Sequence, residues 1–466
     1  MLPDPEQILS VAQMRAAEDA LIARGIGVDE LMQRAGQGTA DWVWRIAGHH
    51  KVTVLCGPGN NGGDGYVIAE ALRARGGKVA VIAATDPRTD AARNARGLYR
   101  GEFLPFDADP HGEVLVDCLF GSGLTRPLDD IHITLLTRLA ASHRHAIAVD
   151  VPSGVESDTG ALLNEGLPRF DLTIALGAWK FAHFLMPASA TVGAIRLVDI
   201  GVAPVFGAAT VLRRPCLAAP AADAHKYRRG LLAVVGGEMP GAALLAARAS
   251  QGAGAGYVKL VAERLSMVPH DLVVDSRHLA DALGDERIAA LLIGPGLGRH
   301  AEARERLVLA LVAQKPTVLD ADALVLLGER LLHEHKAPLV ATPHEGELMT
   351  LEAAFDCDGG DTKPDRVRAL AAASGMVIVA KGPDTVIAAP DGRLACAPRA
   401  SSWLATAGTG DVLAGVIASR LAAGGDSFVS ACDGVWLHGE AARLAGTAFT
   451  ASDLAEYVAP AFAAAL

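Results

Sequence analysis

Two glycine-rich segments carry the clearest chemical signals in this chain. Residues 57–65 read GPGNNGGDG and residues 405–415 read ATAGTGDVLAG, and each segment opens a predicted helix. The first amide groups of a helix have no partner within it and carry partial positive charge, and glycine lets such backbone approach an anion closely. The sequence therefore predicts two sites for phosphate-bearing ligands, one in each half of the chain.

The first segment resembles the turn of dinucleotide-binding folds but differs from it in charge. Residues 57–62 match GxGxxG after a strand, and Asp86 lies just past the next strand, which by itself favours a Rossmann-type site for NAD. Against this, Asn60 and Asn61 add amide groups that such a turn does not require, and Asp64 puts a carboxylate where pyrophosphate would lie. A cation or a hydroxyl partner suits Asp64 better. The structural alternative is a tight turn in which Asp64 caps the helix.

Further polar residues follow the next predicted strands. The motifs VDCLFGSGL and AVDVPSGV place Asp117, Asp150 and Ser153 at the C-terminal ends of two strands. Because such strand ends line one crevice in an open parallel sheet, we expect these side chains to converge with Asn61. Oxygen ligands from Asn, Asp and Ser suit a hard cation, whereas Asp150, close to Pro152, is also a candidate acid or base. Taken singly, either aspartate is more often an ordinary loop residue.

The second segment combines an anion cradle with a carboxylate. Gly408, Thr409 and Gly410 precede a helical run, so their N–H groups are predicted to hold a phosphate. Asp411 is a poor phosphate ligand, but a carboxylate beside an anion site can take a proton from an attacking hydroxyl; helix capping is its structural alternative. The motifs GPGLG, VLDADAL, ATPHEGE and KGPDT each end a predicted strand. Together with the glycine turn, these loops are expected to outline one cleft.

Strand-like and helix-like segments alternate along both halves. Short runs rich in Val, Ile, Leu and Ala predict strands at residues 52–56, 78–84, 113–119, 145–151 and 172–176, and again at 231–236, 257–261, 291–294, 317–320, 339–342 and 376–381. This alternation is typical of α/β folds with mainly parallel sheets flanked by helices. A Pro- and Ala-rich segment at 202–224 predicts the boundary between two domains.

Composition and charge limit the classes of partner. The 466 residues are too many for one ordinary core, and 51% of them are apolar. The formal net charge of −11 argues against a surface that binds nucleic acid or an anionic membrane. Six cysteines without a CxxC pair predict buried free thiols in a reducing compartment. With no basic leader and no apolar run of membrane length, the chain is expected to be cytoplasmic.

Through GNNGGDG, VDCLFGSGL and AVDVPSGV in this order, residues 1–213 resemble the YjeF N-terminal domain, the NAD(P)H-hydrate epimerase family. The resemblance implies a Rossmann-like three-layer fold that interconverts the R and S epimers of hydrated NADH or NADPH. It implies substrate contacts from Asn60, Asn61, Gly62, Gly63, Asp64, Gly121, Ser122, Gly123, Leu124, Thr125, Arg126 and Pro127. It further implies a potassium ion (K⁺) held by Asn61, Asp117 and Ser153, and proton chemistry by Asp150.

Residues 214–466 resemble the ribokinase-like superfamily and, more closely, the ADP-dependent NAD(P)H-hydrate dehydratase family, through HKYRRGLLAVVGG, GAALLAARA, ATPHEGE, KGPDT and GTGDVLAG. The resemblance implies that Ala242, Gly296 and His344 border the hydrate and that Asp411 faces the reacting hydroxyl. It assigns the adenine nucleotide, with magnesium (Mg²⁺), to Lys381, Gly382, Pro383, Asp384, Thr385 and Gly410. The chain departs from the family pattern at Ala407, where a second glycine is usual.

The resulting hypothesis is a repair enzyme with two activities. Its first domain exchanges the two hydrate epimers, and its second domain returns the S epimer to NADH or NADPH at the expense of ADP, giving AMP and phosphate. The main alternative is a kinase for a small vitamin alcohol with a ligand-sensing first half. A third interpretation makes the first half a non-catalytic interaction or RNA-binding module. A homo-oligomer is expected.

Overall fold

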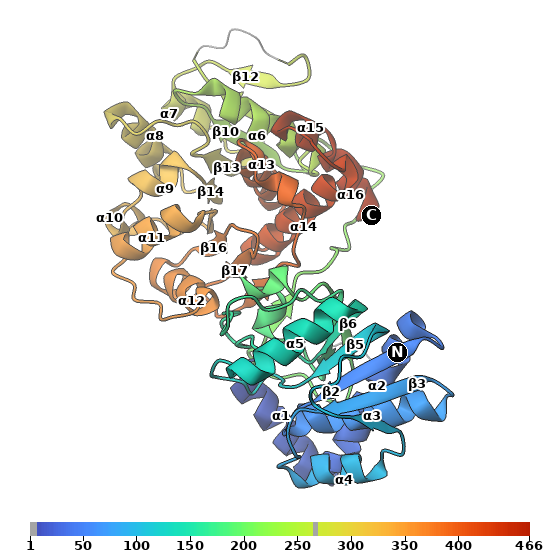
Figure 1. Cartoon of the computed structure of the whole chain (residues 1–466). Coiled ribbons are helices and arrows are strands. Elements are labelled where there is room, and N and C mark those ends of the chain that lie inside the picture. Colours follow the sequence, from blue (N-terminus) through green and yellow to red (C-terminus); the bar gives the residue numbers. More distant parts are fainter. Residues whose placement is uncertain (1–6, 264–268) are drawn as a thin grey trace. The chain divides into compact units, whose positions relative to one another are not determined.

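The computed structural model describes residues 7–263 and 269–466, which form two compact units, Met1–Thr210 and Val211–Leu466 (Figure 1). Each unit consists of a mainly parallel β-sheet flanked by helices, which confirms the α/β class predicted from the sequence. The functional limits at residues 213 and 214 stay a prediction.

The first unit is built on a sheet that is parallel throughout, with the strand order β4-β3-β2-β5-β6-β7-β8. These strands are β2 (Lys51–Cys56), β3 (Lys78–Ala83), β4 (Glu102–Leu104), β5 (Gly112–Cys118), β6 (His143–Val149), β7 (Leu172–Leu176) and β8 (Ala194–Val198). Its α-helices are α1 (Val11–Ala23), α2 (Val28–Ala47), α3 (Asn60–Ala74), α4 (Asp90–Leu98) and α5 (Asp130–Ser142). The 3₁₀ turns η1 (Phe181–His183) and η2 (Ala188–Ala190) follow β7, and β1 (Gln7–Ile8) pairs antiparallel with β9 (Ala209–Val211).

Both faces of this sheet are buried, as its apolar strands require. Val54 and Val116 belong to the core that is shared with α2 and α3, whereas Leu55 and Leu115 pack on the other face with Leu136 of α5. The chain builds β3 and β4 on one side of β2 and then returns to place β5 on the other side. The carboxyl ends of β2 and β5 therefore form a topological switch point, where open α/β sheets bind ligands.

The second unit has a sheet with the strand order β18-β17-β16-β15-β14-β13-β10-β11-β12, in which β16, β17 and β18 pair antiparallel and the other neighbours are parallel. The strands are β10 (Leu231–Val235), β11 (Tyr257–Val261), β12 (Val273–Asp275), β13 (Ile288–Ile293), β14 (Thr317–Leu319), β15 (Leu339–Ala341), β16 (Val377–Ala380), β17 (Val386–Ala388) and β18 (Leu394–Cys396). Here the strand order reverses between β10 and β13, which places a second switch point at their carboxyl ends.

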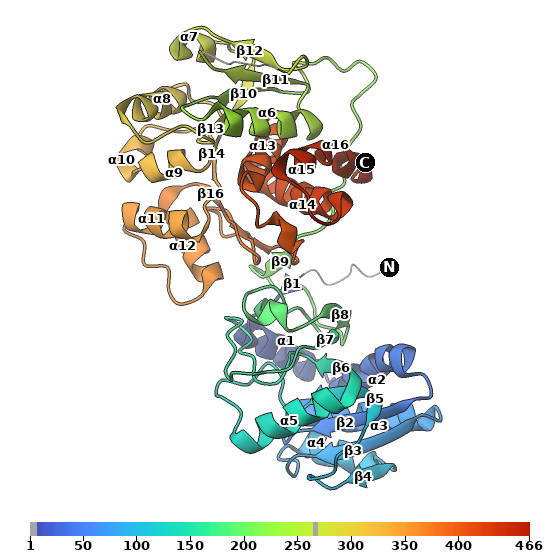
Figure 2. The ribbon, with the colours of Figure 1, turned by 45° about the horizontal axis from the view of Figure 1, so that its top comes forward.

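Helices cover both faces of the second sheet (Figure 2). One group comprises α6 (Pro240–Gly252), α13 (Thr409–Ala422), α14 (Ser427–Ala445), α15 (Ala451–Glu456) and α16 (Val458–Ala464). The other helices are α7 (Leu279–Leu283), α8 (Ala301–Val312), α9 (Asp322–Leu326), α10 (Glu329–Leu332), α11 (Glu345–Ala354) and α12 (Lys363–Ser374), and η3 (Ser402–Leu404) is a single 3₁₀ turn. Helix α13 is apolar nearly all round because it lies between the sheet, α6 and α14.

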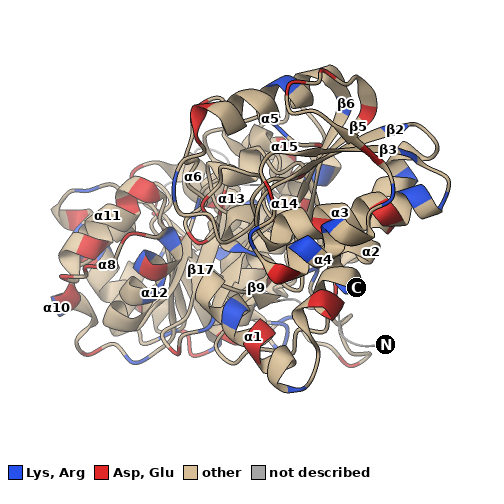
Figure 3. Cartoon of the chain, turned by 60° about the horizontal axis from the view of Figure 1, so that its bottom comes forward, with Lys and Arg blue, Asp and Glu red and all other residues tan. Residues whose placement is uncertain are grey.

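Surface properties match the sequence expectations only partly. Acidic and basic residues are interspersed along the helices (Figure 3). All six cysteines are free thiols, but only Cys56, Cys118 and Cys396 are buried, and Cys216 is exposed, so the expectation of six buried thiols is wrong. Across residues 7–263 and 269–466, none of the helices combines the length and the apolar character needed to cross a bilayer.

Candidate active sites

Asp150 lies directly after β6, at the crevice of the first unit, and is 7% exposed. Its backbone has a φ of 68°, a left-handed conformation that residues other than glycine rarely adopt. The side-chain Oδ1 accepts a hydrogen bond from Lys180 Nζ at 2.5 Å, and Oδ2 accepts one from the Ser122 backbone N–H at 2.9 Å. Burial opposes ionisation, but the ammonium group and the hydrogen bonds together hold the pKa of Asp150 below its usual value.

Lys180 is the functional residue that the sequence interpretation missed. Its side chain is 1% exposed, and its Nζ also donates to the Leu176 carbonyl at 2.7 Å. The neighbouring His183 fixes this arrangement, because its Nδ1 accepts from the Lys180 N–H and its Nε2 donates to the Asp150 carbonyl. Burial and the nearby ammonium lower the pKa of His183 to about 4. The signal in the sequence was a single lysine inside the apolar run ALGAWKFAHF.

Asn61 and Asp150 approach each other across Gly121. A Cβ at Gly121 would lie 3.1 Å from Asp150 Oδ2 and 3.2 Å from Asn61 Cγ, so a larger residue would crowd both side chains. Among the described residues, neither the amide oxygen nor the amide nitrogen of Asn61 has a hydrogen-bond partner, although both atoms are buried. A buried polar group without a partner is costly, and this one faces the crevice where a ligand is expected.

Asp64 lies in the second turn of α3, whose N-cap is Gly59, so the alternative in which Asp64 caps the helix is wrong. It is almost fully buried, and burial, reinforced by the charges of Asp150 and Glu18, raises its pKa well above the usual value. The neighbouring Gly62 and Gly63 are buried too. Of the five residues predicted from Asn60 to Asp64, Asn60 is exposed, Asn61 is half-buried and the other three are buried.

Asp117 and Ser153 are in direct contact, as the strand-end argument predicts. Asp117 Oδ1 accepts from Ser153 Oγ at 2.8 Å and from the Leu119 N–H at 3.0 Å, while Oδ2 accepts from the Ser153 N–H at 3.0 Å. Burial raises the pKa of Asp117 to about 6, even though these hydrogen bonds lower it. Asn61, the third predicted metal ligand, makes no hydrogen bond with either residue in the described structure.

The loop from Gly121 to Pro127 forms the rim of this crevice. Gly121, Ser122 and Leu124 are half-buried, and the Leu124 N–H donates to the Gly121 carbonyl. The remaining members of the predicted set are exposed, namely Gly123, Thr125, Arg126 and Pro127. The structure therefore places the first part of the loop beside Asp150 and the rest at the surface.

In the second unit, Asp411 lies in the first turn of α13, three residues after the N-cap Gly408. Gly408 adopts a φ of 93°, which glycine tolerates, and Asp411 does not cap the helix, so that structural alternative is also wrong. Burial, with a further contribution from Asp320, raises the pKa of Asp411 to about 6, and the nearby Lys381 lowers it. The backbone N–H groups at this helix end have no partner inside the helix.

Lys381 begins the predicted nucleotide loop, and its side chain reaches toward the glycine turn at residues 408–410. Its Nζ lies 2.7 Å from Asp320 Oδ1, 3.9 Å from Glu347 Oε2 and 3.6 Å from where a Cβ on Gly410 would be. Asp320 is nearly fully buried and also accepts from Thr342 Oγ1 at 2.6 Å. Asp320 and Glu347 were not assigned from the sequence, although their motifs, VLDADAL and ATPHEGE, mark two loops of the predicted cleft.

The other predicted nucleotide residues lie in the turn between β16 and β17. Gly382 and Pro383 are exposed, and Thr385 Oγ1 donates to the Gly382 carbonyl at 2.9 Å. Asp384 accepts from Lys363 Nζ at 2.7 Å, which fixes the turn to α12. At the start of α13, Thr409 Oγ1 donates to the Leu404 and Thr406 carbonyls.

Three residues were predicted to border the hydrate. Ala242 lies in the first turn of α6, whose Leu245 would contact a Cβ placed on Gly408 at 2.9 Å. The Gly296 carbonyl accepts from the Met239 N–H at 2.9 Å, just before α6 begins. His344 caps α11, where its Nδ1 accepts from the Glu347 N–H at 3.2 Å, and its side chain is 63% exposed.

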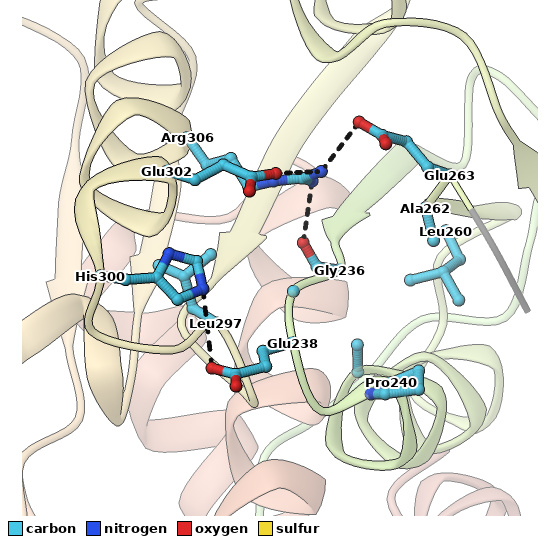
Figure 4. A pocket seen from close by; sticks show the side chains of 12 residues that line it. Gly236, Glu238, Pro240, Leu260, Ala262, Glu263, Leu297, His300, Glu302 and Arg306 are labelled. Carbon is cyan, nitrogen blue, oxygen red and sulfur yellow. Dashed lines mark hydrogen bonds and ion pairs between the residues drawn. The ribbon is translucent and has the colours of Figure 1, made fainter.

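A cavity of about 350 Å³ lies at the switch point between β10 and β13 (Figure 4). Ala243 and Leu297 line it, whereas the predicted residues Ala242 and Gly296 next to them do not. It is lined by the turn 236–238 and by residues of α8 and its N-terminal loop. Arg306 reaches the Gly236 carbonyl at 3.2 Å and Glu263 at 3.0 Å, while His300 Nε2 lies 3.6 Å from Glu238 Oε2.

The buried Asp150 and the half-buried Asp411, each beside a glycine-rich turn on its own sheet, form the arrangement of an enzyme with two active centres. Two family models match the chain, one described as YjeF-related protein N-terminus at residues 28–182 and one as NAD(P)H-hydrate dehydratase at residues 232–462. The bifunctional NAD(P)H-hydrate repair enzyme Nnr of Synechocystis is 32% identical, over 97% of this chain and 94% of the relative. Its namesake in Salinibacter ruber is 34% identical, over 94% and 92%. The chain therefore belongs to the family of bifunctional NAD(P)H-hydrate repair enzymes.

Among solved structures, the second unit matches the ADP/ATP-dependent NAD(P)H-hydrate dehydratase of Bacillus subtilis, which was co-crystallised with ATP and Mg²⁺. That match has 28% sequence identity and covers 54% of this chain and 95% of the other, with a TM-score of 0.48.

Proposed function

We propose that this chain repairs hydrated NADH and NADPH in two steps. The first unit exchanges the R and S epimers, and the second dehydrates the S epimer with ADP as the phosphoryl donor. Membership of the repair-enzyme family over nearly the whole chain supports the proposal. The observation that carries it is the pair of aspartates Asp150, which is buried and kept ionised by Lys180, and Asp411, which is half-buried and has a pKa near 6.

Epimer exchange needs only proton transfer at one oxygen. The hydrated ring carbon carries a hydroxyl group and is bonded to the ring nitrogen, so the nitrogen lone pair can form a C=N bond while the C–O bond breaks. The departing oxygen takes a proton and leaves as water, and water then adds to the opposite face and loses a proton. The ion pair of Lys180 and Asp150 is placed to supply the proton to the departing oxygen, from the ammonium group, and to recover one from the incoming water.

The first unit has a donor set that fits a potassium ion. The Asn61 amide oxygen is buried without a hydrogen-bond partner, and Asp117 is a fully buried carboxyl whose pKa is raised to about 6 by burial. Amide, carboxylate and hydroxyl oxygens suit a hard cation, so Asn61, Asp117 and Ser153 would hold the ion. When bound, it would supply a fixed positive charge for an oxygen of the substrate.

In the second unit, Asp411 acts as the base for phosphoryl transfer. It takes the proton of the ring hydroxyl, whose oxygen attacks the β-phosphorus of ADP while the bond to AMP breaks. The new phosphate ester then leaves as phosphate, driven by the ring nitrogen, and loss of a proton from the adjacent carbon restores the dihydropyridine. Lys381 and the N–H groups of Thr409 and Gly410 hold the nucleotide phosphates.

Magnesium fits the charges of this second site. Asp320, Glu347 and Asp411 place three carboxyl groups around one ammonium group, that of Lys381, where an anionic nucleotide must also bind. Asp320 and Glu347 would hold a divalent cation together with the phosphates. When bound, the cation would neutralise charge on the transferred phosphoryl group.

The test is repair of each hydrate separately. Purified chain with ADP and Mg²⁺ is expected to regain the near-ultraviolet absorbance of reduced nicotinamide from both the R and the S hydrate, with one AMP and one phosphate released for each molecule repaired. A reaction without nucleotide is the control. Failure to recover either hydrate with ADP or ATP would refute the proposal, and a phosphorylated product that persists would favour the vitamin-kinase alternative.

A further inference from the structure

A shallow hollow of about 520 Å³ lies in the first unit, outside the crevice of Asp150, at the end of β3. Arg93, Arg96 and Arg100 line it together with Asp86 and Phe103. Arg93 and Arg96 share one face of α4, and Arg100 follows two residues after its end. Asp86 occupies the place after the second strand where dinucleotide-binding folds carry the residue that recognises the adenosine ribose; an acidic residue there binds the 2′-hydroxyl of NAD, whereas a nearby arginine accommodates the 2′-phosphate of NADP. Here the Asp86 carboxylate is neutralised by Arg96.

The arginines of this hollow are held only by exposed partners. Arg96 pairs with Asp86 at 2.5 Å and Arg93 pairs with Asp90 at 2.5 Å, and both carboxylates are about 90% exposed. Arg100 donates to the Gly97 carbonyl. Exposed ion pairs contribute little to stability, whereas a phosphate dianion offers guanidinium groups strong two-point contacts. A phosphate can therefore replace these carboxylates.

The hollow also offers a stacking surface. The Phe103 ring is 44% exposed, and the Arg96 guanidinium lies 5.5 Å from its centroid. Tyr99 supports the ring edge-on at a centroid distance of 5.2 Å. An exposed aromatic ring beside cationic groups suits a purine that carries a phosphate.

The loop at the edge of the hollow is hydrogen-bonded to the first glycine turn. The Arg88 N–H donates to the Pro58 carbonyl at 2.8 Å, and the Ala84 N–H donates to the Cys56 carbonyl at 2.9 Å, so the loop after β3 touches the loop that leads into α3. Strands β3, β2, β5 and β6 are consecutive neighbours, which puts the strand before Asp150 about 14 Å from the strand before Asp86. An extended dinucleotide spans that distance.

We propose that this hollow binds the adenosine end of the epimerase substrate, with Arg93, Arg96 and Arg100 holding the 2′-phosphate. The first unit then favours hydrated NADPH over hydrated NADH. This inference rests on the proposed epimerase activity and adds the substrate preference of that unit.

The test compares the two substrates in the full chain without ADP, so that only epimer exchange is followed, by chiral chromatography. The double variant R93Q/R100Q is expected to lose about tenfold or more in kcat/KM for hydrated NADPH while hydrated NADH changes by less than about twofold. R75Q is the matched control, because Arg75 is an exposed arginine of the same unit that pairs with Asp41. Adenosine 2′,5′-bisphosphate should inhibit the wild type about tenfold better than 5′-AMP and lose this advantage in R93Q/R100Q.

Equal losses for both substrates, an unchanged ratio, or a bisphosphate that inhibits no better than 5′-AMP would overturn the inference. Wild-type protein that exchanges neither pair of epimers would instead refute the proposed epimerase function. The two failures are thus distinguishable.

Discussion

The two aspartates proposed to be catalytic differ in the partner of the lysine that lies near each of them. In the first unit, Lys180 is bound to Asp150 itself, and the pKa of this carboxyl lies below its usual value. In the second unit, Lys381 is bound to Asp320, and the pKa of Asp411 rises to about 6. Both aspartates are desolvated, so the direction of the pKa shift depends on the partner of the ammonium group.

This difference matches the chemistry proposed for each unit. Epimer exchange takes back the proton that it first donates, which suits a carboxylate and an ammonium group held in one ion pair. Phosphoryl transfer needs a base that gains a proton from a hydroxyl, and a carboxylate with a pKa nearer neutrality is the stronger base. An aspartate and a lysine thus serve a different proposed reaction in each unit, because Lys180 pairs with Asp150 itself whereas Lys381 pairs with Asp320 and not with Asp411.

The largest effect is expected from Asp411→Asn. Removing the base should lower the dehydratase kcat/KM by about 10²- to 10⁴-fold while epimer exchange is unchanged. The measurement is recovery of reduced nicotinamide absorbance from the S hydrate with ADP, with chiral analysis of the hydrates in parallel. Asp433→Asn is the matched control, because burial also raises the pKa of Asp433, which pairs with Arg420 away from the cleft. Comparable losses in both variants would contradict a specific role for Asp411.

An intermediate effect is expected from Lys180→Met, which removes the ion pair from Asp150. The pKa of Asp150 should then rise because burial is no longer offset, and the fall in epimerase rate on the acid side should move to higher pH. We expect about a 100-fold lower rate near neutral pH, with dehydratase activity on the S hydrate as the internal control. A pH–rate profile that keeps its acid limb would show that Lys180 does not set the charge of Asp150.

The smallest effect concerns stability. The pKa of Asp411 is raised in the folded state, so the folded chain binds more protons than the unfolded chain between about pH 4 and 6, and stability falls as pH rises through that window. Asp411→Asn removes the cost of ionising this carboxyl and should raise the free energy of unfolding by about 1 kcal/mol at pH 7.5, after allowance for solvent screening. The gain should vanish at pH 4. Urea unfolding at both pH values checks this, and an equal gain at pH 4 would refute the assignment.

Long apolar strands were predictable from the sequence because buried parallel strands are continuous apolar runs. All eleven predicted strands are present, with ends that differ by a few residues. Strands β17 and β18 were missed although their residues are apolar and buried, because each has only three residues. Two other missed strands lack the apolar signal. Strand β4 has three residues and none is buried, and β8 alternates between exposed and half-buried positions before its last residue. Such strands form because a neighbouring strand offers hydrogen bonds, which one segment of sequence does not reveal.

Contacts between site residues were predictable from the sequence where a general rule of the fold brings distant residues together. Asp117 and Ser153 meet because parallel strands end at one edge of the sheet. Lys180 was not predictable by that rule, since it becomes a buried cation only through the Asp150 carboxylate and the Leu176 carbonyl. Likewise, the pairing of Lys381 with Asp320 depends on two loops that are 61 residues apart.

The hydrogen bonds that join His183 to Lys180 and to the Asp150 carbonyl affect how the first unit responds to acid. His183 titrates near pH 4, so the contacts that orient Asp150 and Lys180 persist through mild acidification. Asp411, by contrast, is half-protonated near pH 6. On the proposed roles, a cell that acidifies keeps interconverting the two hydrate epimers while dehydrating the S epimer more slowly, so the accumulated pool stays a mixture of both epimers that can be repaired once neutrality returns.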